Sequence, residues 1–248
     1  MFNSSWRERL GVWRSLLMYY GVPGRFARMQ RFYAQFIQRG DLCFDIGAHV
    51  GNRLRVWDAL GARMVAVEPQ PALLRCLQRF FGGKHHIVLV DQAIGAEPGN
   101  ATLHISSRTP TVTTLSQQWI GDVKKDKSFN AVEWDQQITV PVTTLDALIA
   151  VHGVPVFCKI DVEGFELEVL RGLTQPIATL SFEYIPASMA VALGCVERLE
   201  QLGRYEYNYS PGETHRLQEV RWLNAQEMLT VLRSINHGSG DVYARLLR

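Results

Sequence analysis

No apolar run in this sequence reaches the ~20 residues that a helix needs to cross a bilayer. The sequence also lacks the charged, then apolar, then small-residue pattern of a secretory signal peptide. These absences favour a cytoplasmic protein without a transmembrane segment.

Paired metal-binding or disulfide-forming residues are scarce as well. The seven histidines show no H-x-x-x-H spacing, and the cysteines form no C-x-x-C pair; they are Cys43, Cys76, Cys158 and Cys195. Free core thiols in a reducing compartment are therefore favoured over disulfides or a metal. Neighbouring acids can hold Mg²⁺, but no acid spacing here specifies such a site, so we predict no metal.

The dinucleotide-binding pattern G-x-G-x-x-G is also absent. In its place, the apolar run 42–46 contains Asp45, turns at Gly47, and passes Gly51 into an amphipathic run at 50–60. This order is typical of the first strand, turn and helix of a nucleotide-binding βαβ unit. The missing middle glycine is the one that lets the backbone approach a pyrophosphate, so a nucleoside without phosphates is favoured over a dinucleotide. S-adenosylmethionine is the commonest such cofactor.

A second apolar run, 64–68, ends at Glu68. This acid follows Gly47 by about 20 residues, where dinucleotide folds place the carboxylate that binds ribose hydroxyls. The sequence therefore predicts a ribose-binding role for Glu68.

Several motifs resemble the FkbM family of S-adenosylmethionine-dependent methyltransferases, over roughly residues 40 to 185. The matching segments are Asp45-Ile-Gly-Ala-His-Val-Gly51, Val67-Glu68-Pro69, Thr144-Leu145-Asp146, Lys159-Ile-Asp-Val-Glu-Gly-Phe-Glu166 and Val169-Leu170-Arg171-Gly172. The family usually has Asn where this chain has His49. The resemblance implies an α/β, Rossmann-like class I methyltransferase fold, with a mostly parallel seven-stranded sheet and an antiparallel last strand.

The resemblance and the rule that ligands bind at the carboxyl ends of parallel strands give a set of candidate site residues. Asp161 and Glu183 are the expected catalytic residues, with Asp161 as general base or as the group that orients the acceptor hydroxyl. Lys159 is expected to form an ion pair within the sheet, and Glu163 to cap the next helix. The expected cofactor-binding residues are Asp45, Gly47, Ala48, His49, Gly51, Glu68, Asp91, Gln92, Ala93 and Asp161.

Among these, Asp91, Gln92 and Ala93 follow the third predicted strand. In the methyltransferase interpretation this loop lies beside the adenine, so Asp91 or Gln92 binds the amino group and Ala93 packs on the ring. A turn acid at the end of a strand is an equally good interpretation of Asp91.

Residues 1–40 carry seven arginines and a single acid, and this segment is predicted to form an N-terminal helical cap. The methyltransferase domain is expected at 41–248. Apolar residues recur at helical spacing at Trp6, Leu10, Trp13, Leu17 and Tyr20, and again at Phe26, Met29, Phe32, Tyr33, Phe36 and Ile37. We expect both stripes to pack on the main domain with the arginines in water. The alternatives are a lid over the cofactor cleft, or a surface that meets an anionic partner or a membrane peripherally.

Further along, 94–106 is interpreted as a β-hairpin and 107–137 as a long polar loop whose residues 111–115 fold over the cleft. The predicted activity is S-adenosylmethionine-dependent O-methylation of a hydroxyl on a sugar, glycan or secondary metabolite. One alternative is a nucleic-acid methyltransferase, disfavoured because the sequence has no N-P-P-Y-type tetrad. The other is a non-catalytic S-adenosylmethionine-binding module.

Overall fold

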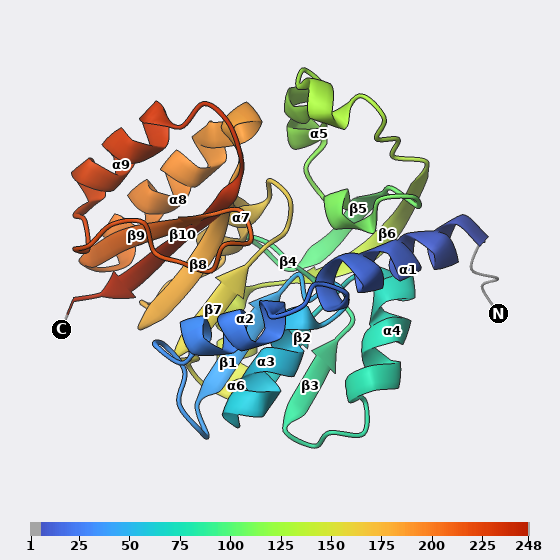
Figure 1. The fold of residues 1–248 in the computed structure, drawn as a ribbon, viewed down its shortest axis with the longest axis horizontal. Coiled ribbons are helices and arrows are strands. Elements are labelled where there is room, and N and C mark those ends of the chain that lie inside the picture. Colours follow the sequence, from blue (N-terminus) through green and yellow to red (C-terminus); the bar gives the residue numbers. More distant parts are fainter. Residues whose placement is uncertain (1–5, 248) are drawn as a thin grey trace.

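A seven-stranded sheet organises the computed structural model, which describes residues 6–247. Its strands are β1 (Leu42–Ile46), β2 (Arg63–Val67), β3 (Ile87–Val90), β7 (Phe157–Ile160), β8 (Thr179–Tyr184), β9 (Tyr205–Pro211) and β10 (Gly240–Leu246). They lie in the order β3-β2-β1-β7-β8-β10-β9 (Figure 1). The first five are parallel to one another, and β10 is antiparallel to both of its neighbours. The expected α/β fold with an antiparallel last strand is therefore confirmed.

Helices cover both faces of this sheet because its central strands are apolar on both sides. One face packs against α2 (Arg25–Tyr33), α3 (Asn52–Leu60) and α4 (Pro71–Phe81). The other packs against α6 (Leu145–His152), α7 (Glu166–Arg171), α8 (Met189–Leu202) and α9 (Ala225–Ser234). Along β1, Phe44 and Ile46 enter the core of the second face and Cys43 that of the first. By the same alternation Asp45 and its register partner Lys159 lie on the α3 side.

A second sheet holds β4 (Ala93–Ile94), β6 (Gln136–Thr143) and β5 (Gly99–Ile105) in that order. The predicted hairpin at 94–106 is wrong, because β4 and β5 pair with opposite edges of β6 rather than with each other. The partner strand lies some thirty residues further along the chain, and a turn pattern carries no information about such a distant partner.

The segment between β5 and β6 is not the open loop that was predicted. It contains the short 3₁₀ turns Pro110–Val112 (η1) and Lys127–Phe129 (η2) and the helix α5 (Gln117–Val123). Trp119 of α5 is buried and contacts Phe129 and Trp134 edge to face. The aromatic side chains give this segment a small core of its own.

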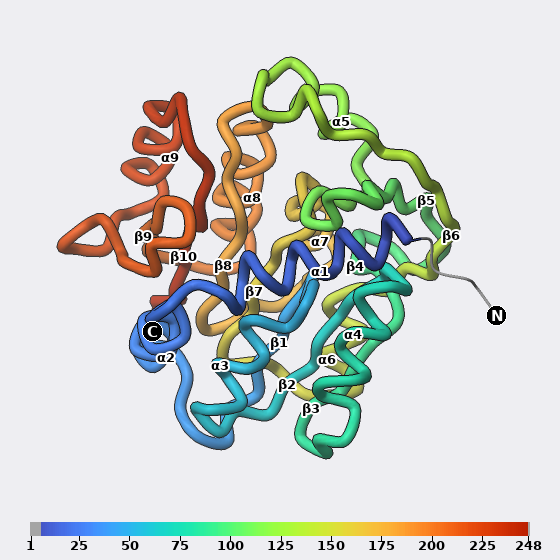
Figure 2. Tube along the Cα trace, turned by 45° about the vertical axis from the view of Figure 1, so that its right-hand side comes forward, coloured from blue at the N-terminus to red at the C-terminus, as the bar shows by residue number. Residues whose placement is uncertain are grey.

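The two N-terminal helices differ in how they pack. α2 buries Met29, Phe32 and Tyr33 in the main core, as expected. α1 (Trp6–Tyr20) runs across the molecule beside α4 and η1 (Figures 1 and 2). The expectation that its apolar stripe packs on the domain is wrong for Trp6, Leu10, Trp13 and Leu17, which are exposed. The contact is made instead by the buried Gly11 and Ser15 and by the partly buried Val12, Leu16, Tyr19 and Tyr20. A Cβ on Gly11 would lie 2.3 Å from the carbonyl oxygen of Ser107, so close approach favours this face.

Local signals at other helix ends are mostly confirmed. Thr144 caps α6 through its hydroxyl, and Asn224 and Glu227 form a complete capping box on α9. Glu163 does not cap α7, because α7 begins at Glu166, whose carboxylate accepts the backbone N–H groups of residues 162 and 164. All four cysteines are free and buried, as predicted. Between residues 6 and 247, no helix has the length and apolar character to cross a membrane.

Candidate active site

The turn after β1 forms the floor of the site. The amides of Gly47 and Ala48 both donate to the carbonyl oxygen of Val67, which ties the turn to the end of β2. Gly47 has φ of 85°, and a Cβ there would lie 1.9 Å from the carbonyl oxygen of Asp161. Only glycine allows β1, β2 and β7 to end this close together. At Gly51 the constraint comes from α4, because a Cβ at this position would lie 2.4 Å from the Phe81 ring.

Glu68 joins the turn to the end of β2. Its carboxylate accepts the backbone N–H of His49 and that of Gln70, each at 2.9 Å. Burial raises the pKa of Glu68 to about 8, although the two amides oppose that shift. The turn and Glu68 therefore face the same space, which is what the ribose-binding prediction requires.

His49 stands at the position where Asn is usual in the family. Its φ of 52° lies in the left-handed region, which His tolerates better than most side chains do. Its Nε2 lies 3.2 Å from the hydroxyl of Ser15, and Tyr19 packs edge-on against the ring. Burial lowers the pKa of His49 to about 4, so the imidazole is neutral at pH 7. Through these contacts, α1 covers the turn after β1.

Three carboxylates meet at the ends of β7 and β8. Oxygen atoms of Asp161, Glu163 and Glu183 all lie within 4.8 Å of one another. Burial and mutual repulsion raise the pKa values of Glu163 and Glu183 well above their usual range. Oε2 of Glu183 is buried and has no hydrogen-bond partner within the described part of the chain. Such a group can face a metal ion or a cationic group of a ligand.

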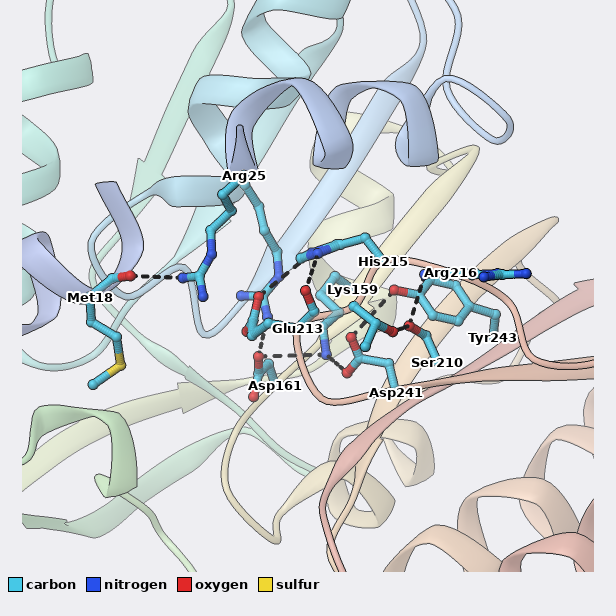
Figure 3. A network of polar contacts seen from close by, with 12 residues as sticks. Met18, Arg25, Lys159, Asp161, Ser210, Glu213, His215, Arg216, Asp241 and Tyr243 are labelled. Atoms are coloured by element: carbon cyan, nitrogen blue, oxygen red, sulfur yellow. Dashed lines mark hydrogen bonds and ion pairs between the residues drawn. The ribbon is translucent and has the colours of Figure 1, made fainter. Parts of the chain in front are cut away.

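Asp161 differs from its two neighbours because two buried cations contact it. Arg53 of α3 forms an ion pair with it, and Lys159 Nζ lies 3.5 Å from its Oδ2 and 2.6 Å from Oδ1 of Asp241 (Figure 3). Burial by itself would raise the pKa of Asp161, but the positive charges of Lys159 and Arg53 have the larger effect and lower this pKa to about 2. The prediction that Lys159 forms an ion pair within the sheet is confirmed.

These groups line one cleft of about 230 Å³. The sequence-predicted residues on its wall are Gly47, His49, Glu68, Ala93, Asp161 and Glu183. The others lie outside this lining: Asp45, Ala48, Gly51, Asp91 and Gln92. Asp45 is fully buried, has no hydrogen-bond partner among residues 6–247 for either carboxylate oxygen, and has a pKa raised by burial to about 7. Asp91 is exposed. A cofactor contact for these five residues stays a prediction.

Other wall residues escaped the sequence-based analysis. Arg53 lies on the buried stripe of α3, four residues before Trp57, and a charged residue in such a stripe was the available signal. Glu163 adopts a positive φ of 55°, and Tyr19 arrives from α1, neither of which a local pattern predicts. The expected folding of residues 111–115 over the cleft is confirmed, since Thr113 donates to the Gln70 side chain at 3.0 Å.

The wall suits S-adenosylmethionine in two respects. Apolar side chains gather on one part of it, which is the surface a purine ring needs: Ala93, Ile94, Leu103, Leu115 and Phe165. The crowded carboxylates, with an unpartnered oxygen on Glu183, suit a ligand that carries positive charge.

Comparison with known proteins identifies the family. The model of the Methyltransferase FkbM domain matches residues 45–190, more than half of the chain. A TehB-like SAM-dependent methyltransferase from Corynebacterium glutamicum is similar in fold, with a TM-score of 0.50, 10% identity, and 95% of this chain and 94% of that chain covered. A precorrin-6y C5,15-methyltransferase from Geobacter metallireducens has a TM-score of 0.44 and 12% identity over 90% of this chain and 87% of that one. No curated protein matches the sequence. The chain belongs to the FkbM family of S-adenosylmethionine-dependent methyltransferases.

Proposed function

We propose that this methyltransferase acts on oxygen, methylating a hydroxyl of a sugar, glycan or secondary metabolite. The observation that carries the proposal is the arrangement of Asp161, Glu163 and Glu183 in the same cleft as Glu68. A hydroxyl must lose its proton as it is methylated, and a neighbouring carboxylate is a suitable acceptor.

In this proposal the half of the cleft formed by β1 and β2 holds the cofactor. The Glu68 carboxylate accepts hydrogen bonds from the ribose hydroxyls, using the lone pairs that the amides of His49 and Gln70 leave free. Ala93 and its apolar neighbours pack on the adenine. When bound, S-adenosylmethionine supplies a methyl carbon made electrophilic by the adjacent sulfonium.

The half formed by β7 and β8 handles the acceptor. Asp161 remains ionised because Lys159 and Arg53 hold its pKa at about 2, so it is a poor proton acceptor but a constant hydrogen-bond acceptor that orients the hydroxyl. Glu183 has a pKa well above its usual range, which makes it the stronger base of the two once ionised. A positive charge in the cleft favours that ionised form, and Glu183 then takes the hydroxyl proton.

Product analysis tests the proposal. The full-length protein is incubated with methyl-labelled S-adenosylmethionine and parallel sets of sugars, phenols, carboxylic acids, amines and RNA. We expect label in base-stable methyl ethers of the hydroxyl set. Label only in amines, in base-labile methyl esters or in the bases of RNA contradicts O-methylation of a hydroxyl. Tight cofactor binding without transfer to any set supports a non-catalytic module.

A further inference from the structure

The outer face of α1 carries an apolar stripe that the rest of the protein does not cover. Trp6, Leu10, Trp13 and Leu17 are 71%, 51%, 64% and 61% exposed. Their spacing of four, three and four residues places all of them on one side of the helix. Four large apolar side chains in one exposed row form the kind of patch that marks an interaction surface.

This stripe cannot turn inward, because the opposite face of α1 is fixed to the protein. Gly11 and Ser15 are buried there, and Ser15 contacts His49 of the cofactor turn. Tyr20 donates to the carbonyl oxygen of Val50 at 3.0 Å. The helix therefore has two faces with different tasks, one that closes the cleft and one that faces outward.

Positive charge accompanies the outward face. Arg7 and Arg14 are exposed and lie about 70 to 90° around the helix from the centre of the stripe, at 100° per residue. Exposed Arg28 and Arg31 follow on α2. Residues 1–40 contain seven arginines and one acid. Pairing two copies of this surface would bring these arginines together, so charge favours an anionic partner over a second copy.

We infer that the outer face of α1 binds the surface of an anionic lipid bilayer. The tryptophans and leucines of the stripe lie at the boundary between headgroups and acyl chains, and the flanking arginines contact lipid phosphates. An apolar face of tryptophan and leucine bordered by arginine is the composition that such interfacial helices use. Because Ser15 and Tyr19 of the inner face adjoin the cleft, this contact holds the cleft next to the lipid surface.

Vesicle sedimentation of the full-length protein tests the inference. We expect the protein to sediment with vesicles of phosphatidylglycerol and phosphatidylcholine, and only weakly with phosphatidylcholine alone. Binding is expected to weaken in about 1 M salt, where the Debye length falls to ~3 Å. The double variant Trp13→Glu/Leu17→Glu should lower the partition coefficient about tenfold, and Arg7→Gln/Arg14→Gln several-fold.

The matched control is Val151→Glu/Val154→Glu, which places two acids on apolar side chains that are 75% and 48% exposed elsewhere on the surface. It should sediment like the unmodified protein. Cofactor affinity reports folding of the variants, because none of the three substituted pairs lines the cleft. The inference is overturned if the unmodified protein does not sediment with anionic vesicles. It is also overturned if the Trp13→Glu/Leu17→Glu variant binds them as tightly as the unmodified protein does. A concentration-dependent dimer or poly(U) binding that needs the stripe, without vesicle binding, assigns it to those partners instead.

Discussion

The two halves of the cleft stabilise their acids in different ways. At the β1–β2 half, Glu68 is held by two backbone amides, those of His49 and Gln70. At the β7–β8 half, Asp161 depends on the side chains of Arg53 and Lys159, while Glu183 keeps an unpartnered oxygen within the described chain. Backbone donors are fixed by the turn, whereas side-chain cations must themselves be held in place.

This difference separates two tasks. A carboxylate on fixed amides is preorganised to bind a constant group such as the cofactor ribose. Crowded carboxylates with displaced pKa values suit proton transfer and a variable acceptor. We therefore expect substitutions in the first half to change cofactor affinity, and substitutions in the second half to change turnover.

Gly47→Ala should have the largest effect, because its Cβ would lie 1.9 Å from a backbone oxygen at a positive φ. We expect cofactor binding to be lost in isothermal titration calorimetry. Gly83→Ala is the control, since its Cβ meets nothing within 4 Å. A normal binding isotherm for Gly47→Ala contradicts the proposed floor of the cleft.

Asp161→Asn removes the carboxylate that neutralises Arg53 in a buried ion pair. Breaking such a pair leaves an uncompensated charge, and we expect the free energy of unfolding to fall by about 3 kcal/mol. Urea denaturation measures the loss, with exposed Asp126→Asn as control. Turnover should fall more than cofactor affinity, and the opposite pattern would make Asp161 a cofactor-binding residue.

Glu183→Gln keeps the shape of the side chain and removes its basicity. We expect kcat to fall about 100-fold, the usual contribution of a general base, with cofactor affinity nearly unchanged. Single-turnover kinetics with the best acceptor give the measurement, and exposed Glu197→Gln is the matched control. An unchanged kcat would mean that another residue acts as the general base.

Glu68→Ala should weaken cofactor binding by about 1–3 kcal/mol, because ribose hydroxyls lose their acceptor. The backbone N–H groups of His49 and Gln70, which donate hydrogen bonds to Glu68, would also lose their acceptor. Thermal unfolding is therefore measured alongside calorimetry to show that the variant is folded. Glu97→Ala, at an exposed position, is the control. Full affinity in a folded Glu68→Ala protein would refute the ribose assignment.

The last expected effect is a pH dependence of stability in the absence of cofactor. Burial raises the pKa of Glu68 from 4.5 to about 8, so the folded state holds this proton more tightly than the unfolded chain does. Its stabilising contribution is complete below pH 4.5 and is lost as the pH rises to about 8. We expect the unfolding free energy of the unmodified protein, minus that of Glu68→Gln, to fall across this window. A constant difference would mean that Glu68 titrates normally.

Sequence patterns predicted that Gly47 and Glu68 lie together, but they did not predict the ion pair of Arg53 with Asp161. Gly47 and Glu68 end neighbouring parallel strands close in the chain, so spacing places them together. Arg53 of α3 and Asp161 at the end of β7 are more than a hundred residues apart in the sequence, so no local pattern predicts their contact. Glu163 was predicted to cap the next helix, but the backbone turns left-handed at this residue and α7 begins only at Glu166, which the surrounding residues do not signal.

The same limit explains the error on α1. Periodicity identified the helix and its apolar stripe, but burial was assigned to the wrong face. Gly11 allows a close approach to residues 107–110, and the partly buried Val12, Leu16 and Tyr19 of the inner face pack on the domain beside it. The positions of Asp91 and Gln92 relative to the adenine stay predictions.

A crystal structure of the protein with S-adenosylhomocysteine tests the central claim most directly. The account predicts ribose hydroxyls within hydrogen-bond distance of the Glu68 carboxylate, with the sulfur directed toward Asp161 and Glu183. An adenosyl group bound elsewhere, or a ribose that does not touch Glu68, would contradict it.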